Sequence, residues 1–320
     1  MSAVLCIGEA LIDMFCTDFN RPLQQGENFV KKAGGAPANV AAAIVAMGGK
    51  ASLAAMVGVD PFGKFLRDTI ASYGVDIQHI LSSPDHFTTL AFVSLLDQGE
   101  RDFYFSRGAD GQYDVSAVER IDLAKYAVVH FGSATAFLPG PLQTTYAHLF
   151  HKAITNNLFV SFDPNYRQLL FPNNTEYFIE CCWKYILHAD FIKVSEEEAC
   201  MLTRQTTPLA AATEFRKNGA QLFAITLGKE GTLFSHPDGF LQVPSIPIQP
   251  IDTTGAGDAF VGAVLYQIAK ENFKRGQSPS IQEFEKIIAT ANKVAAKTCE
   301  HLGAMESFKH LNLMERESKS

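Results

Sequence analysis

Residues 251–260 read Ile-Asp-Thr-Thr-Gly-Ala-Gly-Asp-Ala-Phe, and this stretch organises the interpretation of the whole chain. Gly255, Ala256 and Gly257 carry almost no side chain, so a ligand can approach their backbone N–H groups closely. The apolar run that follows, residues 259–269, predicts a helix. Those N–H groups would then lie at a helix N-terminus, where unpaired donors and the helix dipole favour an anion.

Asp258 places a carboxylate in the first turn of that helix, beside the predicted anion site. There it could accept a proton from a hydroxyl that attacks a bound phosphate. The same residues also allow a purely structural interpretation, because an acid in a first turn stabilises the helix dipole and short motifs match by chance. Our working hypothesis is that this turn is the phosphoryl-transfer centre of a kinase.

Composition limits the class of protein. The chain has 320 residues, a hydrophobic fraction of 47% and a net charge of -7. It is therefore expected to fold, either as one large domain with an appendage or as two. The negative charge argues against nucleic acid or an anionic membrane as the main partner. No apolar run is long enough for a membrane helix, and no leader-like segment precedes the first strand.

The six cysteines show no C-x-x-C spacing and fall partly in apolar elements. Reduced thiols in the cytoplasm are expected, not a disulfide framework or a zinc site.

Strand-like and helix-like segments alternate along most of the chain, which predicts βαβ units and a mainly parallel sheet with helices on both faces. The predicted strands are 3–7, 52–57, 127–131, 158–162, 191–194 and 222–227, with a hairpin over 232–243. The predicted helices are 37–47, 62–73, 142–156, 176–187, 196–202, 209–218, 259–271 and 281–298, and a short segment begins at 75–76.

One predicted hairpin interrupts this alternation. Residues 89–96 and 101–106 are β-rich and flank a four-residue loop, 97–100. The hairpin is expected to stand outside the main sheet. Phe92, Phe103, Tyr104 and Phe105 would give it apolar faces, which must cover either a substrate or a partner subunit.

Polar residues follow several predicted strands, where open α/β sheets bind ligands. Asp13 follows the first strand, and a turn-capping role is its alternative. The Gly34-Gly35 pair suits a bend, and Asn39 in the helix that follows carries both a donor and an acceptor, as a sugar hydroxyl requires. A bond from Asn39 to a neighbouring loop is the structural alternative.

Further along, Arg167 could bind an anion in a bidentate manner, either phosphate or a substrate carboxylate. Glu196, Glu197 and Glu198 could hold Mg²⁺ through water or could simply stabilise a helix N-terminus. The turn from Gly228 to Gly231 suits a nucleotide or an ordinary left-handed turn. In dinucleotide-binding folds, a G-x-G-x-x-G motif follows the first strand. This chain has no such motif there, and its absence disfavours a nicotinamide oxidoreductase.

Together these segments resemble the ribokinase-like (phosphofructokinase-B type) carbohydrate kinases, and the fructokinases most closely. The resemblance rests on residues 34–39, 163–167, 193–198 and 252–258, in the family's order. It implies a three-layer α/β/α sandwich over residues 1–320, a single α/β domain with a mainly parallel central sheet. A small β-sheet lid would be formed by about 14–33 and 88–107.

The resemblance also implies roles for individual residues. Asp258 would be the catalytic base, Gly255, Ala256 and Gly257 the anion hole, and Arg167 the arginine near the sugar end that receives phosphate. The substrate would contact Asp13, Gly34, Gly35, Asn39, Asn165, Arg167 and Asp258, with Phe92 and Phe105 of the lid above it.

ATP would lie along residues of four segments: Lys193, Thr226, Gly228, Gly231, Gly255, Gly257 and Asn292. Glu198 would hold Mg²⁺ through water. A monovalent cation such as K⁺ would sit at Asp252, Thr254, Gly303 and Ser307. Ser195 stands where the family often has asparagine, so the metal role is assigned to Glu198 alone.

The expected function is therefore transfer of the ATP γ-phosphoryl group to the 6-hydroxyl of D-fructose. A kinase of 2-keto-3-deoxygluconate, ribose or another small sugar is the nearest alternative, and a catalytically silent sugar-binding protein is the alternative from another class. The apolar strands of the lid predict a homodimer formed through it.

Overall fold

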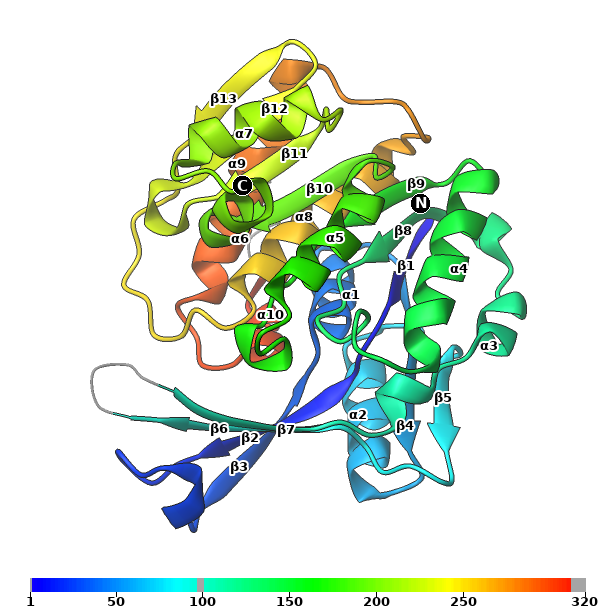
Figure 1. Ribbon diagram of the computed structural model, residues 1–320, viewed down its shortest axis with the longest axis vertical. Coiled ribbons are helices and arrows are strands. Elements are labelled where there is room, and N and C mark those ends of the chain that lie inside the picture. The colour runs from blue at the N-terminus through cyan, green and yellow to red at the C-terminus, as the bar shows by residue number, and fades with distance from the viewer. Residues whose placement is uncertain (1, 97–100, 312–320) are drawn as a thin grey trace.

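The computed structural model describes residues 2–96 and 101–311, whose centre is a nine-stranded sheet in the order β13-β12-β11-β10-β9-β8-β1-β4-β5 (Figure 1). Its strands are β1 (Ala3–Ile7), β4 (Ala51–Gly58), β5 (Ile80–Ser83), β8 (Tyr126–Phe131), β9 (Phe159–Phe162), β10 (Phe191–Ser195), β11 (Phe223–Thr226), β12 (Thr232–His236) and β13 (Gly239–Val243). All neighbouring strands run parallel from β11 to β5, while β12 and β13 are antiparallel.

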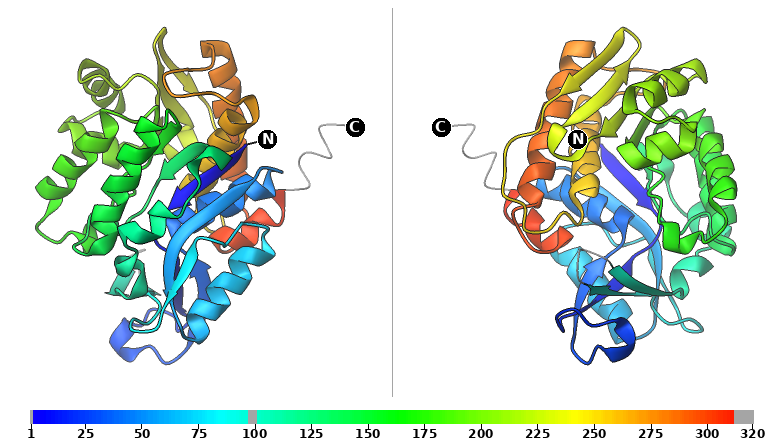
Figure 2. Two further views of the ribbon diagram at one scale, coloured as in Figure 1. Left: turned by 90° about the vertical axis from the view of Figure 1, so that its right-hand side faces the viewer. Right: turned by 60° about the vertical axis from the view of Figure 1, so that its left-hand side comes forward.

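Helices cover both faces of this sheet, which confirms the predicted mixed α/β fold (Figures 1 and 2). The helices are α1 (Ala36–Ala46), α2 (Pro61–Ser72), α3 (Val115–Glu119), α4 (Pro141–Thr155), α5 (Thr175–Ile186), α6 (Glu196–Thr203), α7 (Pro208–Lys217), α8 (Ala256–Glu271), α9 (Ile281–Thr298) and α10 (Ala304–Phe308). The central strands are mostly apolar because both of their faces are buried. In β1, Val4 packs on one side and Leu5 on the other.

Local signals start several helices where the sequence predicts them. Asp60 caps α2 by accepting bonds from the N–H groups of Phe62 and Gly63. Ser195 and Glu198 form a capping box at the start of α6. Helix α8 begins at Ala256, three residues earlier than predicted, because Gly255 adopts a left-handed conformation (φ 78°) and lets the helix begin directly after it.

A second, four-stranded sheet stands apart from the first, and we call it the small sheet. Its order is β3-β2-β6-β7, with β2 at Leu11–Cys16, β3 at Phe29–Gly34, β6 at Leu90–Leu95 and β7 at Arg101–Ser106. The predicted hairpin is confirmed as β6 and β7, while its loop, 97–100, lies outside the described residues. The sequence patterns do not predict β2 and β3 as strands.

The register of the small sheet decides which side chains share a face. Asp13 lies opposite both Lys32 and Ala91, and Ala91 lies opposite Phe105. Phe92 is one residue out of step and lies opposite Met14 and Tyr104. Since successive side chains of a strand point to opposite faces, Asp13, Lys32 and Phe105 share one face and Phe92 the other.

All six cysteines are free thiols. Across the described parts of the chain, we find no helix that combines the length and apolar character needed to cross a bilayer.

Candidate active site

The glycine turn at the start of α8 is shaped by tertiary contacts. A Cβ added to Gly255 would collide with Ala304, and one added to Gly257 would lie 3.0 Å from the Lys193 ammonium. Gly255 therefore has no room for a side chain, and Gly257 keeps the backbone next to the ammonium. The N-terminus of α8 and a lysine are aimed at the same small region, which suits a phosphate group.

Asp258 lies in the first turn of α8 and is bound to Asn39 of α1. The Asn39 Nδ2 group donates a hydrogen bond of 2.8 Å to Asp258 Oδ2, although the two residues are 219 positions apart. Both residues are buried. The other amide atom, Asn39 Oδ1, is buried with no hydrogen-bond partner among the described residues. A buried acceptor of this kind fits a substrate hydroxyl that donates to it.

The surroundings of Asp258 set its basicity. Burial raises the pKa of its carboxyl group above the ordinary value, and the hydrogen bond from Asn39 and the charges of Arg167 and Lys193 partly offset that rise. A raised pKa suits a carboxylate that must take up a proton during the reaction.

Asp13 faces the same site from β2. Gly34 allows this, because a Cβ at Gly34 would collide with Asp13 Oδ2. Burial raises the pKa of Asp13 to about 7; Arg167 lowers it, and the charges of Glu9 and Asp258 raise it further. Arg167 is exposed, and its guanidinium donates to the carbonyl of Tyr166 at 3.1 Å. The structure thus brings Asp13, Asp258 and Arg167 together, as expected.

Glu9 is a residue of this region that the sequence analysis missed. Its Oε1 accepts from the N–H of Ala36 at 3.2 Å, and its Oε2 accepts from the Ser133 hydroxyl at 2.5 Å. It is fully buried, which raises its pKa to about 7. Glu9 therefore fixes the start of α1, where Gly35 (φ 105°) passes too close to the Glu9 carbonyl for any side chain. The signal in the sequence was an acid directly after a buried strand.

A second group of charges lies beneath the glycine turn. Lys193 Nζ is 3.1 Å from Asp163 Oδ2, and both side chains are buried. Burial raises the pKa of Asp163 to about 6 against the lowering effect of Lys193. Burial alone would lower the pKa of Lys193, but Asp163, Glu198 and Asp258 together raise it, so the ammonium stays charged.

Glu198 and Asn165 are held by backbone groups. Glu198 accepts from the N–H of Tyr166 at 2.7 Å and from the N–H of Ser195 at 2.8 Å. Asn165 adopts a left-handed conformation (φ 50°), and its amide donates to the carbonyl of Gly132. Asn165 therefore shapes the loop after β9, and its Nδ2 group is committed to the protein.

These carboxylates fit a magnesium ion held mostly by water. In the part of the chain that the structure describes, no three Asp, Glu, His or Cys side chains converge to bind a metal by themselves. Mg²⁺ usually keeps several waters and takes one or two carboxylates together with substrate phosphates. Glu198 and Asp163 lie close enough to Lys193 to act on its charge, so their oxygens are the available partners.

The residues predicted to contact ATP differ in how much space the protein leaves around them. Gly228 is open to solvent with φ 57°, whereas a Cβ at Gly231 would collide with the carbonyl of Val243. Thr226 donates to the carbonyl of Val194 at 3.3 Å. Gly228 is thus free for a ligand, while Gly231 is required for packing.

The predicted approach of Asn292 to the adenine is corrected by its contacts. Its Oδ1 accepts from Thr232 at 2.6 Å, and its Nδ2 donates to the carbonyl of Val243 at 3.0 Å. The side chain is buried and joins α9 to β12 and to the end of β13. Asn292 therefore acts as a structural clamp, because its amide is occupied on both sides.

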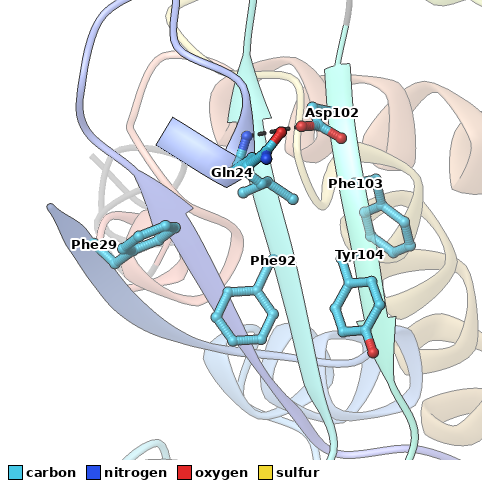
Figure 3. A pocket seen from close by; sticks show the side chains of 7 residues that line it. Gln24, Phe29, Phe92, Asp102, Phe103 and Tyr104 are labelled. Carbon is cyan, nitrogen blue, oxygen red and sulfur yellow. Dashed lines mark hydrogen bonds between the residues drawn. The ribbon is translucent and has the colours of Figure 1, made fainter. Parts of the chain in front are cut away.

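Phe105 and Phe92 lie on opposite faces of the small sheet. Phe105 shares the face of Asp13, as predicted for a residue above the sugar. Phe92 lies on the opposite face, where Phe29, Tyr104 and Asp102 help to line an apolar depression of about 490 Å³ (Figure 3). This position contradicts the predicted role of Phe92 over the substrate, because the register turns its ring away from Asp13.

Hydrogen bonds join Asp252 to two other residues of the predicted cation loop, Thr254 and Gly303. Asp252 Oδ1 accepts from the N–H of Thr254, and Oδ2 accepts from the N–H of Gly303, both at 2.9 Å. Ser307 is buried and donates to the carbonyl of Ala304. Burial would raise the pKa of Asp252, but the bonds from Thr254 and Gly303 and the charge of Lys32 lower it. Carboxylate, hydroxyl and carbonyl oxygens of this kind fit a hard cation.

Known proteins resemble this chain over nearly its whole length. Residues 1–311 match the model of the pfkB family of carbohydrate kinases. The chain belongs to this family. The chain is 34% identical to fructokinase-1 of Zea mays over 313 residues, which is 95% of this chain and 94% of that protein.

Solved structures of this family superpose closely on the kinase. A Xylella fastidiosa fructokinase with bound ATP is 29% identical, with a TM-score of 0.84 over 99% of both chains. A double mutant of a Vibrio cholerae fructokinase, solved with fructose, ADP and a potassium ion, is 30% identical, with a TM-score of 0.81 over 96% of this chain and 95% of that one. The kinase thus has the family's fold over its whole described length.

Proposed function

We propose that this carbohydrate kinase transfers the γ-phosphoryl group of ATP to the 6-hydroxyl of D-fructose. The observation that carries the proposal is the pairing of Asn39 with Asp258. It orients the base and leaves a buried acceptor, Asn39 Oδ1, for a sugar hydroxyl. The similarity to fructokinases over nearly the whole chain supports fructose among the sugars.

In the mechanism, the sugar is held between α1 and the small sheet. Asp13 accepts bonds from sugar hydroxyls, and Asn39 Oδ1 accepts another. Asp258 accepts a bond from the hydroxyl that will be phosphorylated and takes its proton as the oxygen attacks. Asn39 keeps the carboxylate aimed at that proton throughout.

The phosphate groups lie at the N-terminus of α8. The N–H groups of the glycine turn and Lys193 stabilise the charge on the moving phosphoryl group, and Arg167 stabilises it at the sugar end. Glu198 would hold Mg²⁺ through water, and the ion would supply countercharge to the phosphates. Phosphoryl transfer depends mainly on positioning and charge neutralisation, which these groups provide without covalent chemistry.

The small sheet is proposed to act as a lid. Phe105 lies on the face that carries Asp13, so closure of the sheet over the sugar would exclude water, which otherwise competes as the acceptor.

The decisive experiment is ADP release measured by a coupled assay with D-fructose, D-ribose, D-glucose and 2-keto-3-deoxygluconate. The highest kcat/KM is expected with D-fructose, and ³¹P and ¹³C NMR of the product should show the 6-phosphate. A higher kcat/KM with another substrate would reassign the sugar. Sugar binding without ADP release from any substrate would establish a silent binding protein and overturn the proposal.

A kinase of 2-keto-3-deoxygluconate is the second candidate, and the exposed guanidinium of Arg167 favours it. Arg167 acts on Asp13 and Asp258 at once, so it can face a substrate carboxylate beside the reacting hydroxyl. If this candidate is right, Arg167→Leu should raise the KM for the sugar acid far more than the KM for D-fructose.

We also propose a cytoplasmic homodimer formed through the small sheet. The free cysteines and the use of ATP support the location. The depression lined by Phe29, Phe92 and Tyr104 supports the dimer, since Tyr104 is 63% exposed on an apolar face.

A further inference from the structure

A buried carboxylate lies at the root of the β6–β7 hairpin, outside the site described above. Asp110 belongs to the turn Ala109–Gln112 that follows β7, and its side chain is fully buried. Its Oδ2 lies 3.4 Å from Arg107 Nε, and its Oδ1 accepts a hydrogen bond from the hydroxyl of Thr89, just before β6. The Thr89 hydroxyl oxygen in turn accepts from the N–H of Gly108 at 2.9 Å. Asp110 therefore ties together both strands of the hairpin where they join the main body.

The first connection from Asp110 to the sugar site runs through the backbone of Thr89. While the Thr89 hydroxyl donates to Asp110, the Thr89 carbonyl accepts from the N–H of Ile12 at 3.0 Å. Ile12 directly precedes Asp13 on β2, so two hydrogen bonds connect Asp110 to the backbone next to Asp13. The position of Asp13 at the site therefore depends on the root of β6 staying in place.

The second connection runs through the segment that follows β8. The Thr135 hydroxyl donates to Asp110 Oδ2 at 2.9 Å, and the Thr135 N–H donates to the hydroxyl oxygen of Ser133 at 3.2 Å. Ser133 donates to Glu9, which accepts from the N–H of Ala36 at the start of α1. Because α1 carries the partner of the proposed catalytic base, this chain reaches from Asp110 to the other side of the sugar site.

A charged pair strengthens this junction. Arg107 also donates to the carbonyl of Thr135 at 3.2 Å and to that of Pro139 at 2.6 Å, so its guanidinium binds both the acid and the segment after β8. Hydrogen bonds with a charged partner are the stronger ones, and a buried polar network whose groups are satisfied holds one arrangement. Burial raises the pKa of Glu9, and the charge of Asp110 adds to that rise, so the two acids act on each other.

We propose that Asp110 is a positioning residue for the sugar site of this kinase, an inference that rests on the proposed function. Through Thr89 it fixes the strand that carries Asp13, and through Thr135 and Ser133 it fixes the start of α1. The two sides of the sugar site thus share one buried anchor, which keeps the small sheet in place relative to the catalytic base. Asp110 acts through these groups and not on the reacting atoms, because both of its oxygens bind donors from the protein.

The test compares Asp110→Asn with Asp190→Asn, which both keep the size of the side chain and remove its charge. Asp190 is the matched control because it also pairs with an arginine, Arg275 at 3.0 Å, and accepts from the N–H groups of Val160 and Gly276. It directly precedes β10, so it lies at the opposite end of that strand from the phosphate site. Both substitutions should lower Tm, because each leaves a buried arginine without its acid.

Two measurements distinguish positioning from a general loss of stability. Steady-state ADP release is recorded with D-fructose, or with another sugar if the substrate panel assigns one. Hydrogen exchange of residues 11–16, followed by mass spectrometry, reports on β2 and needs no sugar.

For Asp110→Asn, the KM for the sugar should rise roughly tenfold, because a small displacement of a binding residue is costly, while kcat and the KM for ATP stay within about twofold. The amides of β2 should exchange faster than in the wild type. Asp190→Asn should leave both KM values and the exchange of β2 unchanged.

Thr135→Val tests the second connection by itself, since it removes the hydroxyl that binds Asp110 and keeps the shape of the side chain. It should raise the KM for the sugar by a smaller factor than Asp110→Asn. The double variant should raise it no more than Asp110→Asn alone, because residues of one hydrogen-bond network do not act independently.

The proposal is overturned if Asp110→Asn keeps the wild-type KM for the sugar, or if Asp190→Asn raises it equally. It is also overturned if the exchange of β2 is the same in Asp110→Asn and the wild type. If no sugar supports ADP release by the wild type, the proposed function fails, while hydrogen exchange still decides the role of Asp110. If Asp110→Asn does not fold, Thr135→Val decides alone, and a wild-type KM for the sugar in that variant overturns the proposal.

Discussion

At the scale of single residues, the site depends on how acids are placed next to their partners. Asp258 gains its orientation from Asn39 and its raised pKa from burial. Asp13 and Glu9 are neighbours of the same site and share the effect of burial. The charges of Glu9 and Asp258 raise the pKa of Asp13 further, and the charge of Arg167 opposes that rise.

Asp258→Asn should remove the proton acceptor and keep the shape of the site. We expect kcat to fall by roughly 10²–10⁴, the usual effect of losing a general base. ATP affinity, measured by isothermal titration calorimetry, should change little. Asp68→Asn on the exposed face of α2 is the matched control and should retain activity. Near-normal turnover by Asp258→Asn would show that another group takes the proton.

The buried acids also predict how stability depends on pH. The pKa of Glu9 is raised from 4.5 to about 7 and that of Asp13 from 3.8 to about 7. The folded state therefore holds protons that the unfolded state releases between about pH 4 and pH 7. The contribution of these two groups to folding stability is fully present below pH 4, and it is lost as the pH rises through 7.

Glu9→Gln should remove the part of this pH-dependent loss of stability that Glu9 causes. That part is on the order of 3 kcal/mol in the free energy of unfolding. Urea denaturation from pH 5 to pH 8 should therefore give a flatter curve of unfolding free energy for this variant than for the wild type. Glu285→Gln, at an exposed position of α9, should leave the slope unchanged. Equal slopes for all three proteins would mean that Glu9 is ionised in the folded state at pH 5.

At the scale of elements, the join between β3 and α1 connects the small sheet to the central one. Gly34 faces Asp13, and Gly35 passes over the Glu9 carbonyl. The glycine pair is thus explained by two close contacts, and the bend that it permits carries Asp13 and Asn39 to the same site.

Gly34→Ala should push Asp13 away from the sugar and raise the KM for D-fructose by roughly tenfold or more, since small displacements at a site are costly. The KM for ATP should stay near the wild-type value. Gly48→Ala is a useful comparison, because Gly48 has φ 84° but no atom within 4 Å of an added Cβ. It should lower stability by about 1 kcal/mol and leave both KM values unchanged. An unchanged fructose KM in Gly34→Ala would remove Asp13 from the sugar site.

The two faces of the small sheet can be tested by a pair of variants. Phe105→Ala should raise the KM for D-fructose and increase ATP hydrolysis without sugar, because its ring lies on the face of Asp13. Phe92→Ala should keep the kinetic constants within about twofold, since it lies on the other face. The reverse result in steady-state assays would mean that the sheet pairs in a different register.

At the scale of the whole molecule, the small sheet projects from the main body, and its outer face is apolar (Figures 1 and 3). The four strands leave two edges, β3 and β7. Both features suit association with a second copy of the chain.

We expect sedimentation velocity to give a dimer for the wild type at micromolar concentration. Tyr104→Asp places a charge on the apolar outer face, far from the Asp13 face, and should shift the protein to a monomer. Tyr177→Asp, another tyrosine exposed on the main body, should remain dimeric. A monomeric wild type would exclude this assembly.

The sequence by itself determined the mixed α/β fold and the order of most helices and strands, and it predicted the start of α8 as the centre of the site. These follow from local physics: apolar periodicity, helix caps, and the conformational freedom of Gly255 and Gly35. The free cysteines and the separate hairpin were predictable for the same reason.

The tertiary structure alone decided which residues share the site. Asn39 meets Asp258, Lys32 meets Gly303, and Glu9 holds Ala36 through contacts between segments far apart in the chain, which no local pattern encodes. The roles of Phe92 and Asn292 changed because a one-residue register and two buried hydrogen bonds determine where those side chains point.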